Sequence, residues 1–299
     1  MPQAAPVTLR PLVLMAAALA LTAGCATPAE EAVGPPRKET VHAVTASNQL
    51  ISFNAGQPQK VLSRKPLTGL AAGETLVGID YRVARGQLFG LTTAGRLVRL
   101  DTARASVEPV GQPLDLGLAD EVIGFDFNPT VDRIRLVGSK GRNQRLHPDT
   151  GALVDGDANT PGIQPDGALA YVAGDSSAGK PARVVAAGYT YNKQDEKITS
   201  NYAIDAGQGT LVLQGSREGG TPAVSPNTGR LTTVGTLGVP SFTRASFDIA
   251  DVSNAAFLST DGPSGRESRW YQVDLSSGKA TFIGTIRASE PVTGIAIEP

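Results

Sequence analysis

The sequence predicts an all-β fold, namely a five-bladed β-propeller whose ring is closed by pairing of its N- and C-terminal strands. The first supporting observation is composition. The 299 residues include 34 glycines and 21 prolines but only 5% aromatic residues, which is typical of many short strands joined by turns. The second is the segment GFDFNPTVDRIRLV at residues 124–137, in which two runs of alternating apolar residues flank an Asn-Pro turn. A chain of this length can bury a core without metals or disulfides.

Weaker copies of the start of this segment recur along the chain and set the number of blades. Each copy has a small residue, an apolar residue, a variable residue and another apolar residue. The copies begin at positions 78, 124, 188, 246 and 294, so successive copies start 46 to 64 residues apart. Repeats of about 40–50 residues, with loops inserted in the longer ones, are typical of four-stranded propeller blades. We therefore expect each of the first four copies to be followed by three further strands.

The two ends of the chain complete the count. Residues 294–297 have the pattern of an inner strand, but no blade follows them. Residues 41–44, 49–53 and 60–62 have the pattern of outer strands, but no inner strand precedes them. Pairing these segments would build a fifth blade from both termini and leave no open sheet edge. A β-sandwich, or another number of blades, is the alternative.

Residues 1–24 resemble a bacterial lipoprotein signal peptide, so they are excluded from the fold. Arg10 supplies a positive charge before the apolar residues 12–21, which are too few to span a bilayer as a helix. Residues 21–25, LTAGC, resemble a lipobox, although Thr22 stands where Leu is commoner.

Cys25 is the only cysteine in the chain, and the resemblance implies that it is acylated, for example with palmitate, and becomes the mature N-terminus. Several acyl chains would hold the protein on a membrane, and Ala26 fits the pattern sorted to the outer membrane, on either its periplasmic or its surface face. Residues 25–40 are rich in Pro, Ala and Glu, which predicts a flexible tether. Residues 41–299 are then the propeller domain.

The chain from about residue 41 to residue 299 resembles a family of secreted bacterial proteins known only as a domain of unknown function. The motifs that carry this resemblance are GFDFNP at residues 124–129 and DRIR at residues 132–135. Further similarity covers residues 73–80, 146–151, 166–171, 185–189 and 231–238. The resemblance implies a propeller-like fold and export, but it carries no activity.

Three carboxylates form the first candidate site. Asp80, Asp126 and Asp248 occupy the same position of three inner-strand motifs, so all three are expected near the central channel. A pair of carboxylates ~5–9.5 Å apart suffices for glycoside hydrolysis. Equivalent positions, however, provide like environments, whereas catalysis requires environments that separate the two pKa values. The competing interpretation is therefore a repeated structural hydrogen bond.

A basic and polar cluster forms the second candidate site. Arg133 and Arg135 alternate on one expected strand, and Asn143, Arg145 and His147 alternate on the next. Converging guanidinium groups would suit a carboxylate or phosphate ligand, which predicts Arg133, Arg135, Asn143 and Arg145 as ligand-binding residues. The alternative is a structural network between blades in which Asp126 and Asp132 neutralise the arginines.

Metal and nucleophilic chemistry receive little support. Asp155, Asp157, Asn159 and Asp166 have the oxygen-ligand spacing of a calcium loop, but Thr160 replaces the glycine that the turn requires. Calcium is thus a weak alternative to having no cofactor. Only two histidines occur, and there is no Gly-x-Ser-x-Gly motif or His/Cys cluster. Trp270, the only tryptophan, could fill the core or be an exposed stacking residue.

These observations predict a monomeric envelope lipoprotein whose propeller binds a partner protein or a glycan without catalysing a reaction. The formal net charge of −1 argues against nucleic acid as a partner. The alternative function is a glycoside or lactone hydrolase that uses the inner-strand carboxylates. The two differ because a hydrolase requires two neighbouring carboxylates in an open pocket, one of them with a raised pKa.

Overall fold

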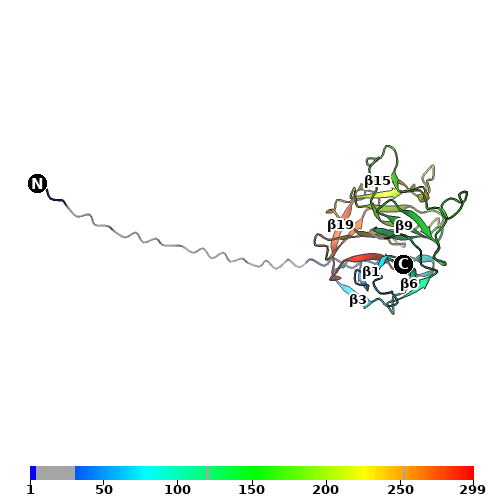
Figure 1. Ribbon diagram of the computed structural model, residues 1–299, viewed down its shortest axis with the longest axis horizontal. Helices are drawn as coiled ribbons and strands as arrows, with labels where there is room; N and C mark the ends of the chain where they lie inside the picture. Colours follow the sequence, from blue (N-terminus) through cyan, green and yellow to red (C-terminus); the bar gives the residue numbers. More distant parts are fainter. Residues whose placement is uncertain (5–30, 119–120, 252) are drawn as a thin grey trace. The chain divides into compact units, whose positions relative to one another are not determined.

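The computed structural model confirms the five-bladed β-propeller (Figure 1). It describes residues 1–4, 31–118, 121–251 and 253–299. The chain divides into two units, Met1–Glu31 and Ala32–Pro299, and the propeller is the second. Cys25 lies outside the described residues. Within the part that is described, no helix combines the length and the apolar character needed to cross a bilayer.

Blade 1 is built from both ends of the chain, as the sequence predicts. The last strand pairs antiparallel with the first, and Val41 and Ala43 lie opposite Ile297 and Ile295. Figure 1 shows the red C-terminal strand beside β1. The strand order is β20 (Val292–Ile297), β1 (Thr40–Thr45), β2 (Gln49–Asn54) and β3 (Val61–Pro66).

Blades 2 and 5 are regular four-stranded antiparallel sheets, as expected from the repeat. A 3₁₀ turn, η1 (Val83–Arg85), follows the inner strand of blade 2. Blade 2 contains β4 (Leu76–Arg82), β5 (Gln87–Thr92), β6 (Leu97–Asp101) and β7 (Ser106–Val110). Blade 5 contains β16 (Ala245–Ile249), β17 (Ala256–Asp261), β18 (Ser268–Val273) and β19 (Ala280–Ile286).

Blades 3 and 4 depart from four strands each. In blade 3 the expected fourth strand at residues 152–154 forms only the isolated bridge Leu146↔Leu153, because Asp155 accepts from the backbone N–H of Asp157 and Gln164 and starts a loop. Blade 4 gains a parallel fifth strand. Blade 3 contains β8 (Ile123–Asn128), β9 (Arg133–Gly138) and β10 (Asn143–Leu146); blade 4 contains β12 (Val184–Tyr189), β13 (Asn201–Asp205), β14 (Thr210–Gln214), β15 (Arg230–Thr236) and β11 (Ala170–Tyr171), with the 3₁₀ turn η2 (Pro226–Thr228) before β15.

The five inner strands surround a channel that closes at its waist. Each inner strand packs against the inner strands of the two neighbouring blades, in the ring order β20, β4, β8, β12, β16. A small residue on each inner strand makes this approach possible, and in blade 4 this residue is Ala186, two positions before the start of the copy that the sequence predicts at residue 188. A Cβ atom on Gly124 would lie 2.7 Å from Cα of Ala186 in the next blade, and one on Gly78 would lie 2.6 Å from Cβ of Phe125. The space left at the waist is only about 10 Å³.

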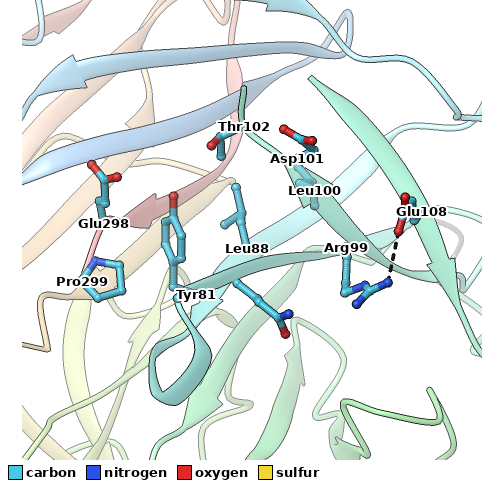
Figure 2. A pocket seen from close by; sticks show the side chains of 11 residues that line it. Tyr81, Leu88, Arg99, Leu100, Asp101, Thr102, Glu108, Glu298 and Pro299 are labelled. Carbon is cyan, nitrogen blue, oxygen red and sulfur yellow. Dashed lines mark hydrogen bonds and ion pairs between the residues drawn. The ribbon is translucent and has the colours of Figure 1, made fainter. Parts of the chain in front are cut away.

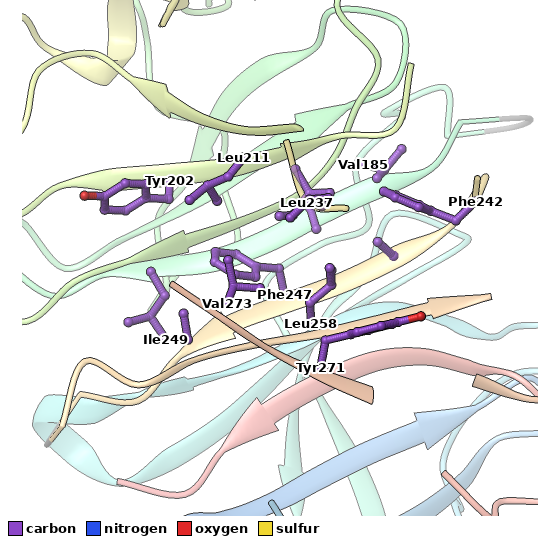
Figure 3. Close-up of a cluster of buried hydrophobic side chains, with 14 of the residues drawn as sticks. Val185, Tyr202, Leu211, Leu237, Phe242, Phe247, Ile249, Leu258, Tyr271 and Val273 are labelled. Atoms are coloured by element: carbon purple, nitrogen blue, oxygen red, sulfur yellow. The ribbon is translucent and has the colours of Figure 1, made fainter. Parts of the chain in front are cut away.

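Apolar side chains fill the spaces between blades. Figure 3 shows the cluster between blades 4 and 5, where Tyr202 and Leu211 of one blade face Phe247 and Leu258 of the other. Between blades 5 and 1, Trp270 is fully buried. It stacks on Phe257 at 5.3 Å and donates from Nε1 to the carbonyl oxygen of Ala55. Trp270 therefore fills the core, which settles the question that the sequence leaves open.

The predicted tether is shorter than residues 25–40, because its second half lies against the propeller. Arg37 donates its backbone N–H to the Asn54 side chain and its guanidinium to Gln272. Gln57 donates to the carbonyl oxygen of Gly34, and Gln59 to that of Ala32. Residues 32–39 thus form a strap across blades 1 and 5. Composition suggested disorder, but side-chain amides of the propeller satisfy the polar backbone of the strap.

We expect Arg37→Ala to lower the free energy of unfolding by about 1 kcal/mol, because Arg37 also lies over the Phe257 ring at 5.7 Å. Urea denaturation measures this change. Lys38→Ala is the control, since Lys38 is an exposed neighbour in the strap. If both variants match the wild type, the strap does not contribute to stability.

Candidate functional site

The three inner-strand carboxylates lie close together, as the sequence predicts. Asp80, Asp126 and Asp248 are buried, and one carboxylate oxygen of each lies within 4.8 Å of those of the others. Each also bonds to the next blade. Asp80 accepts from the N–H of Phe127 at 2.6 Å, and Asp126 accepts from that of Tyr189 at 2.9 Å. Asp248 likewise accepts from the N–H of Ile297 in the next blade at 2.6 Å.

Two of these carboxylates accept a second backbone hydrogen bond with their other oxygen. Asp80 and Asp248 also accept from the N–H of their own neighbours, Tyr81 and Ile249. The preceding blades carry Ala296 and Gly188 at the equivalent position, so no carboxylate from there competes for these two N–H groups. The repeated aspartate thus fastens one blade to the next.

Burial and mutual repulsion hold protons on these groups. Desolvation by burial raises the pKa of Asp80 and of Asp126 well above the usual value, and the nearby carboxylates raise both further. Burial raises the pKa of Asp248 to about 6. Asp251, two residues after the end of β16, has a pKa raised to about 7 by burial and by the charge of Asp248. Several of these carboxyl groups are therefore protonated near neutral pH.

The carboxylate cluster meets two of the three requirements of a hydrolase. The groups are close together and their pKa values are raised, but none of Asp80, Asp126 and Asp248 is more than 7% exposed. None of them is among the lining residues of the described cavities. A saccharide could not reach carboxylates that are sealed in this way. Catalysis by them stays a prediction, and their burial argues against it.

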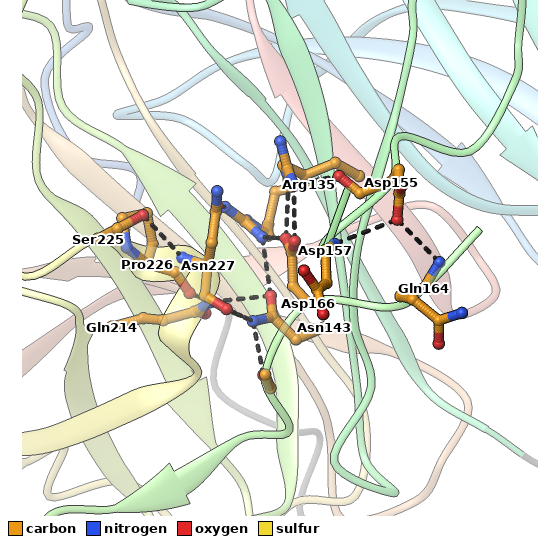
Figure 4. A network of polar contacts seen from close by, with 12 residues as sticks. Arg135, Asn143, Asp155, Asp157, Gln164, Asp166, Gln214, Ser225, Pro226 and Asn227 are labelled. Carbon is orange, nitrogen blue, oxygen red and sulfur yellow. Dashed lines mark hydrogen bonds and ion pairs between the residues drawn. The ribbon is translucent and has the colours of Figure 1, made fainter. Parts of the chain in front are cut away.

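The basic cluster lies between blades 3 and 4, where Arg135 is at the centre of a buried polar network (Figure 4). Its Nη1 donates to Asn143 at 2.8 Å and to Asp166 at 2.6 Å. Its Nη2 donates to Asn227 of η2, and its Nε donates to the Tyr189 hydroxyl. Four of the five N–H groups of Arg135 are thus occupied, and Arg135 joins the two blades as a structural residue.

Asp166, and not Asp126 or Asp132, neutralises this cluster. Its side chain is fully buried and bonds to both Arg135 and Arg145. Arg145 binds it with Nε at 2.8 Å and Nη2 at 2.7 Å. The sequence could not reveal this partner because Asp166 lies in a loop outside the repeat. Asp132 instead forms an ion pair with Arg82 of blade 2.

The same geometry bears on the possible calcium loop. Asp166 would have to release two arginines to bind an ion. Asp157 bonds to Asn159 and Thr160 within its own exposed turn, and Asp155 caps the loop backbone. In the described parts of the chain, the only acidic cluster compact enough for a metal ion is that of the inner-strand aspartates. Calcium binding at the loop stays a prediction, and the pairing of Asp166 argues against it.

A cavity of about 260 Å³ opens beside this network. The guanidinium groups of Arg133, Arg135 and Arg145 line it, and none of its lining residues is acidic. The other lining residues are Asn128, Val131, Val154, Tyr189 and Asn227. The structure therefore brings together three of the four predicted ligand-binding residues. Asn143 lies behind the cavity, where it holds Arg135 in place.

The chain matches the model of a family described as a domain of unknown function (DUF4394) over residues 49–296. It belongs to this family. The match confirms the resemblance seen in the sequence, and it runs from the start of β2 in blade 1 to residue 296 in β20, so it includes all five blades. No curated protein matches the chain.

This DUF4394 chain also has distant similarity to solved structures. One is a structural genomics protein of unknown function from Bacteroides thetaiotaomicron, with 12% identity and a TM-score of 0.43 over 83% of this chain and 58% of that one. Another is PorZ, a surface component of the type-IX secretion system of Porphyromonas gingivalis, with 18% identity and a TM-score of 0.35 over 84% of this chain and 28% of that one. The DUF4394 chain thus spans between about a quarter and three fifths of the length of these proteins.

The DUF4394 chain also has a cleft that its sequence did not indicate (Figure 2). The cleft, of about 530 Å³, lies where the end of β20 meets blade 2, and Tyr81, Leu100 and Glu298 line it. Arg99 at its rim is paired with Glu108 at 3.1 Å. Its lining residues come from blade 2 and from the C-terminal residues 298–299, which are distant from each other in sequence, so no single motif marks it.

Proposed function

We propose that this DUF4394 protein is a lipid-anchored envelope lipoprotein whose propeller binds, without catalysis, an anionic group of a glycan or a partner protein. The binding site is the cavity between blades 3 and 4. The observation that carries the proposal is the charge of this cavity: Arg133, Arg135 and Arg145 line it, and the single buried carboxylate of Asp166 pairs only with Arg135 and Arg145. This arrangement leaves an excess of positive charge facing an open space.

The free hydrogen-bond donors belong to Arg133 and Arg145. Among the described residues, Arg133 donates only from Nη1, to the backbone oxygens of Val131 and Asp132. Arg145 uses Nε and Nη2 on Asp166 and on the backbone of Asp155, and it is 16% exposed. The remaining guanidinium N–H groups can form paired bonds to a carboxylate or phosphate. The fixed position of Arg145 on Asp166 lowers the entropy lost on binding.

The chemistry of the cavity favours binding over reaction. Guanidinium groups stay protonated and cannot act as general bases at neutral pH. The apolar side chains of Val131 and Val154 complete the wall, which suits a small anionic residue such as a uronic acid or a chain-terminal carboxylate. A cavity of about 260 Å³ admits one such unit.

The test is isothermal titration with glucuronate, inorganic phosphate and glucose, using the wild type and Arg133→Ala. We expect glucuronate or phosphate to bind and glucose not to bind. Arg133→Ala should weaken anion binding about 10–100-fold, because one charge-assisted contact contributes roughly 1.5–3 kcal/mol. Its melting temperature should not change, since Arg133 makes no ion pair within the described residues.

Arg99→Ala is the matched control, because Arg99 is an exposed arginine in blade 2. It should bind both anions as the wild type does. Equal affinity of the wild type and Arg133→Ala for the anions would contradict the proposed site. The anchor is tested separately by palmitate labelling in cells. Wild-type protein should be labelled and Cys25→Ala should not, and equal labelling would remove the anchor.

A further inference from the structure

The place where the strap enters the propeller decides which edge lies nearest to the N-terminal anchor. Gln59 donates to the carbonyl oxygen of Ala32, the first residue of the propeller unit. A Cβ atom on Gly284 of β19 would lie 2.1 Å from the Gln59 side chain. Ala32 is therefore at the outer rim of the ring, where β3 of blade 1 meets β19 of blade 5.

The chain between the proposed lipid and this rim is short. Seven peptide units separate Cys25 from Ala32. Even fully extended, they reach only about 25 Å. The rim around Ala32 must therefore stay near the membrane surface whenever Cys25 is anchored, whatever the conformation of the connecting residues.

Positive charge gathers at this rim. Residues 55–73 and 275–289 contain no acidic residue, although the chain as a whole is nearly neutral. Lys60, Arg64 and Arg287 are exposed. Arg64 donates to the backbone oxygen of Arg287, and the backbone N–H of Arg287 donates to Pro58, so the two arginines are neighbours. We call Lys60, Leu62, Arg64 and Arg287 the basic rim.

The basic rim also has an apolar component. Leu62 is 66% exposed. Because Leu62 and Arg64 are two residues apart on the edge strand β3, they share its exposed face. Acidic residues border the ranges 55–73 and 275–289 in sequence, namely Glu74, Asp274 and Glu290, and Glu290 interacts electrostatically with Arg64. The carboxylate of Glu290 accepts from the hydroxyls of Thr45 and Ser47. An exposed leucine between cations is suited to the interface between lipid headgroups and acyl chains.

We propose that the basic rim docks on anionic lipid headgroups and fixes the orientation of the propeller on its membrane. This inference rests on the proposed anchor at Cys25. In the ring order, blade 3 lies opposite the junction of blades 5 and 1. Docking at this junction therefore turns the arginine-lined cavity between blades 3 and 4 away from the membrane, toward soluble or cell-wall partners.

The test is lysine footprinting on vesicles. The mature chain is coupled through Cys25 to a maleimide lipid, so that anchoring does not depend on acylation in the cell. Acetylation rates of Lys60 and Lys140 are then measured by mass spectrometry on phosphatidylglycerol and on phosphatidylcholine vesicles. Lys60 belongs to the basic rim, and Lys140 is an exposed lysine of blade 3.

We expect Lys60 to be acetylated about fivefold more slowly on the anionic vesicles, and Lys140 at the same rate on both. About 0.5 M salt should abolish the difference, because it screens exposed charges. The double variant Arg64→Glu/Arg287→Glu should also abolish it without changing the melting temperature, since both side chains are exposed.

Equal acetylation of Lys60 on the two lipids, or slower acetylation of Lys140 instead, would overturn the docking proposal. Because the lipid is attached chemically, a failure of palmitate labelling in cells would remove the natural anchor without altering this result. The two proposals can thus fail independently.

Discussion

The protein is expected to lose roughly 3–5 kcal/mol of stability between pH 5 and pH 8, because its channel carboxyl groups hold their protons only in the folded state. Asp248 and Asp251 have pKa values of about 6 and about 7, and those of Asp80 and Asp126 are also raised. In the unfolded chain all four titrate near pH 4. Between these values the folded state binds more protons than the unfolded state, so stability is greatest below about pH 4 for these groups and falls as the pH rises.

Urea denaturation at several pH values measures this slope, and Asp126→Asn locates its source. The asparagine oxygen can still accept from the N–H of Tyr189, while one of the crowded charges is removed. The variant should therefore lose less stability than the wild type between pH 5 and pH 8. Asp115→Asn is the control, because Asp115 is exposed. Stability that is constant or increases over this range would contradict the assignment.

The number of blades could be predicted because the packing of the inner strands leaves a short motif in the sequence of each blade. A small residue is required wherever two inner strands approach closely, as at Gly78 and Gly124, so the motif is visible in the sequence. Closure of the ring was predictable for a similar reason. The inner strand at residues 294–297 has no outer strands after it, and the outer strands from residue 41 have no inner strand before them. Pairing the two segments completes one blade.

The functions of individual polar residues were harder to predict, because their partners lie outside the repeat. The register of Asp80, Asp126 and Asp248 indicated a shared location, but only the fold shows that their acceptors face the backbone of the next blade. Arg135 and Arg145 were correctly placed on neighbouring strands. Their counterion comes from a loop with no periodicity. The strap was missed because its composition resembles a linker.

We expect Asp166→Ala to lower the free energy of unfolding by about 3–5 kcal/mol, because it leaves buried positive charge without a counterion. The Asp166 side chain is fully buried, and Arg135 and Arg145 are only 2% and 16% exposed. Asp166→Asn should cost less than Asp166→Ala, since its side-chain oxygen can still accept one hydrogen bond. The midpoint of urea denaturation gives the change, provided that the slope with urea stays the same.

Asp157→Ala is the matched control for this substitution. Asp157 lies in the same loop, but its exposed side chain bonds only within its own turn, so the variant should unfold almost as the wild type does. If Asp166 served a calcium ion instead of the two arginines, calcium chelation would destabilise the wild type as strongly as Asp166→Ala does. A loss of less than about 1 kcal/mol in Asp166→Ala would mean that water compensates the two guanidinium groups. In that case the cavity beside them would be wetter and less preorganised for an anion than the hydrogen bonds around Asp166 imply.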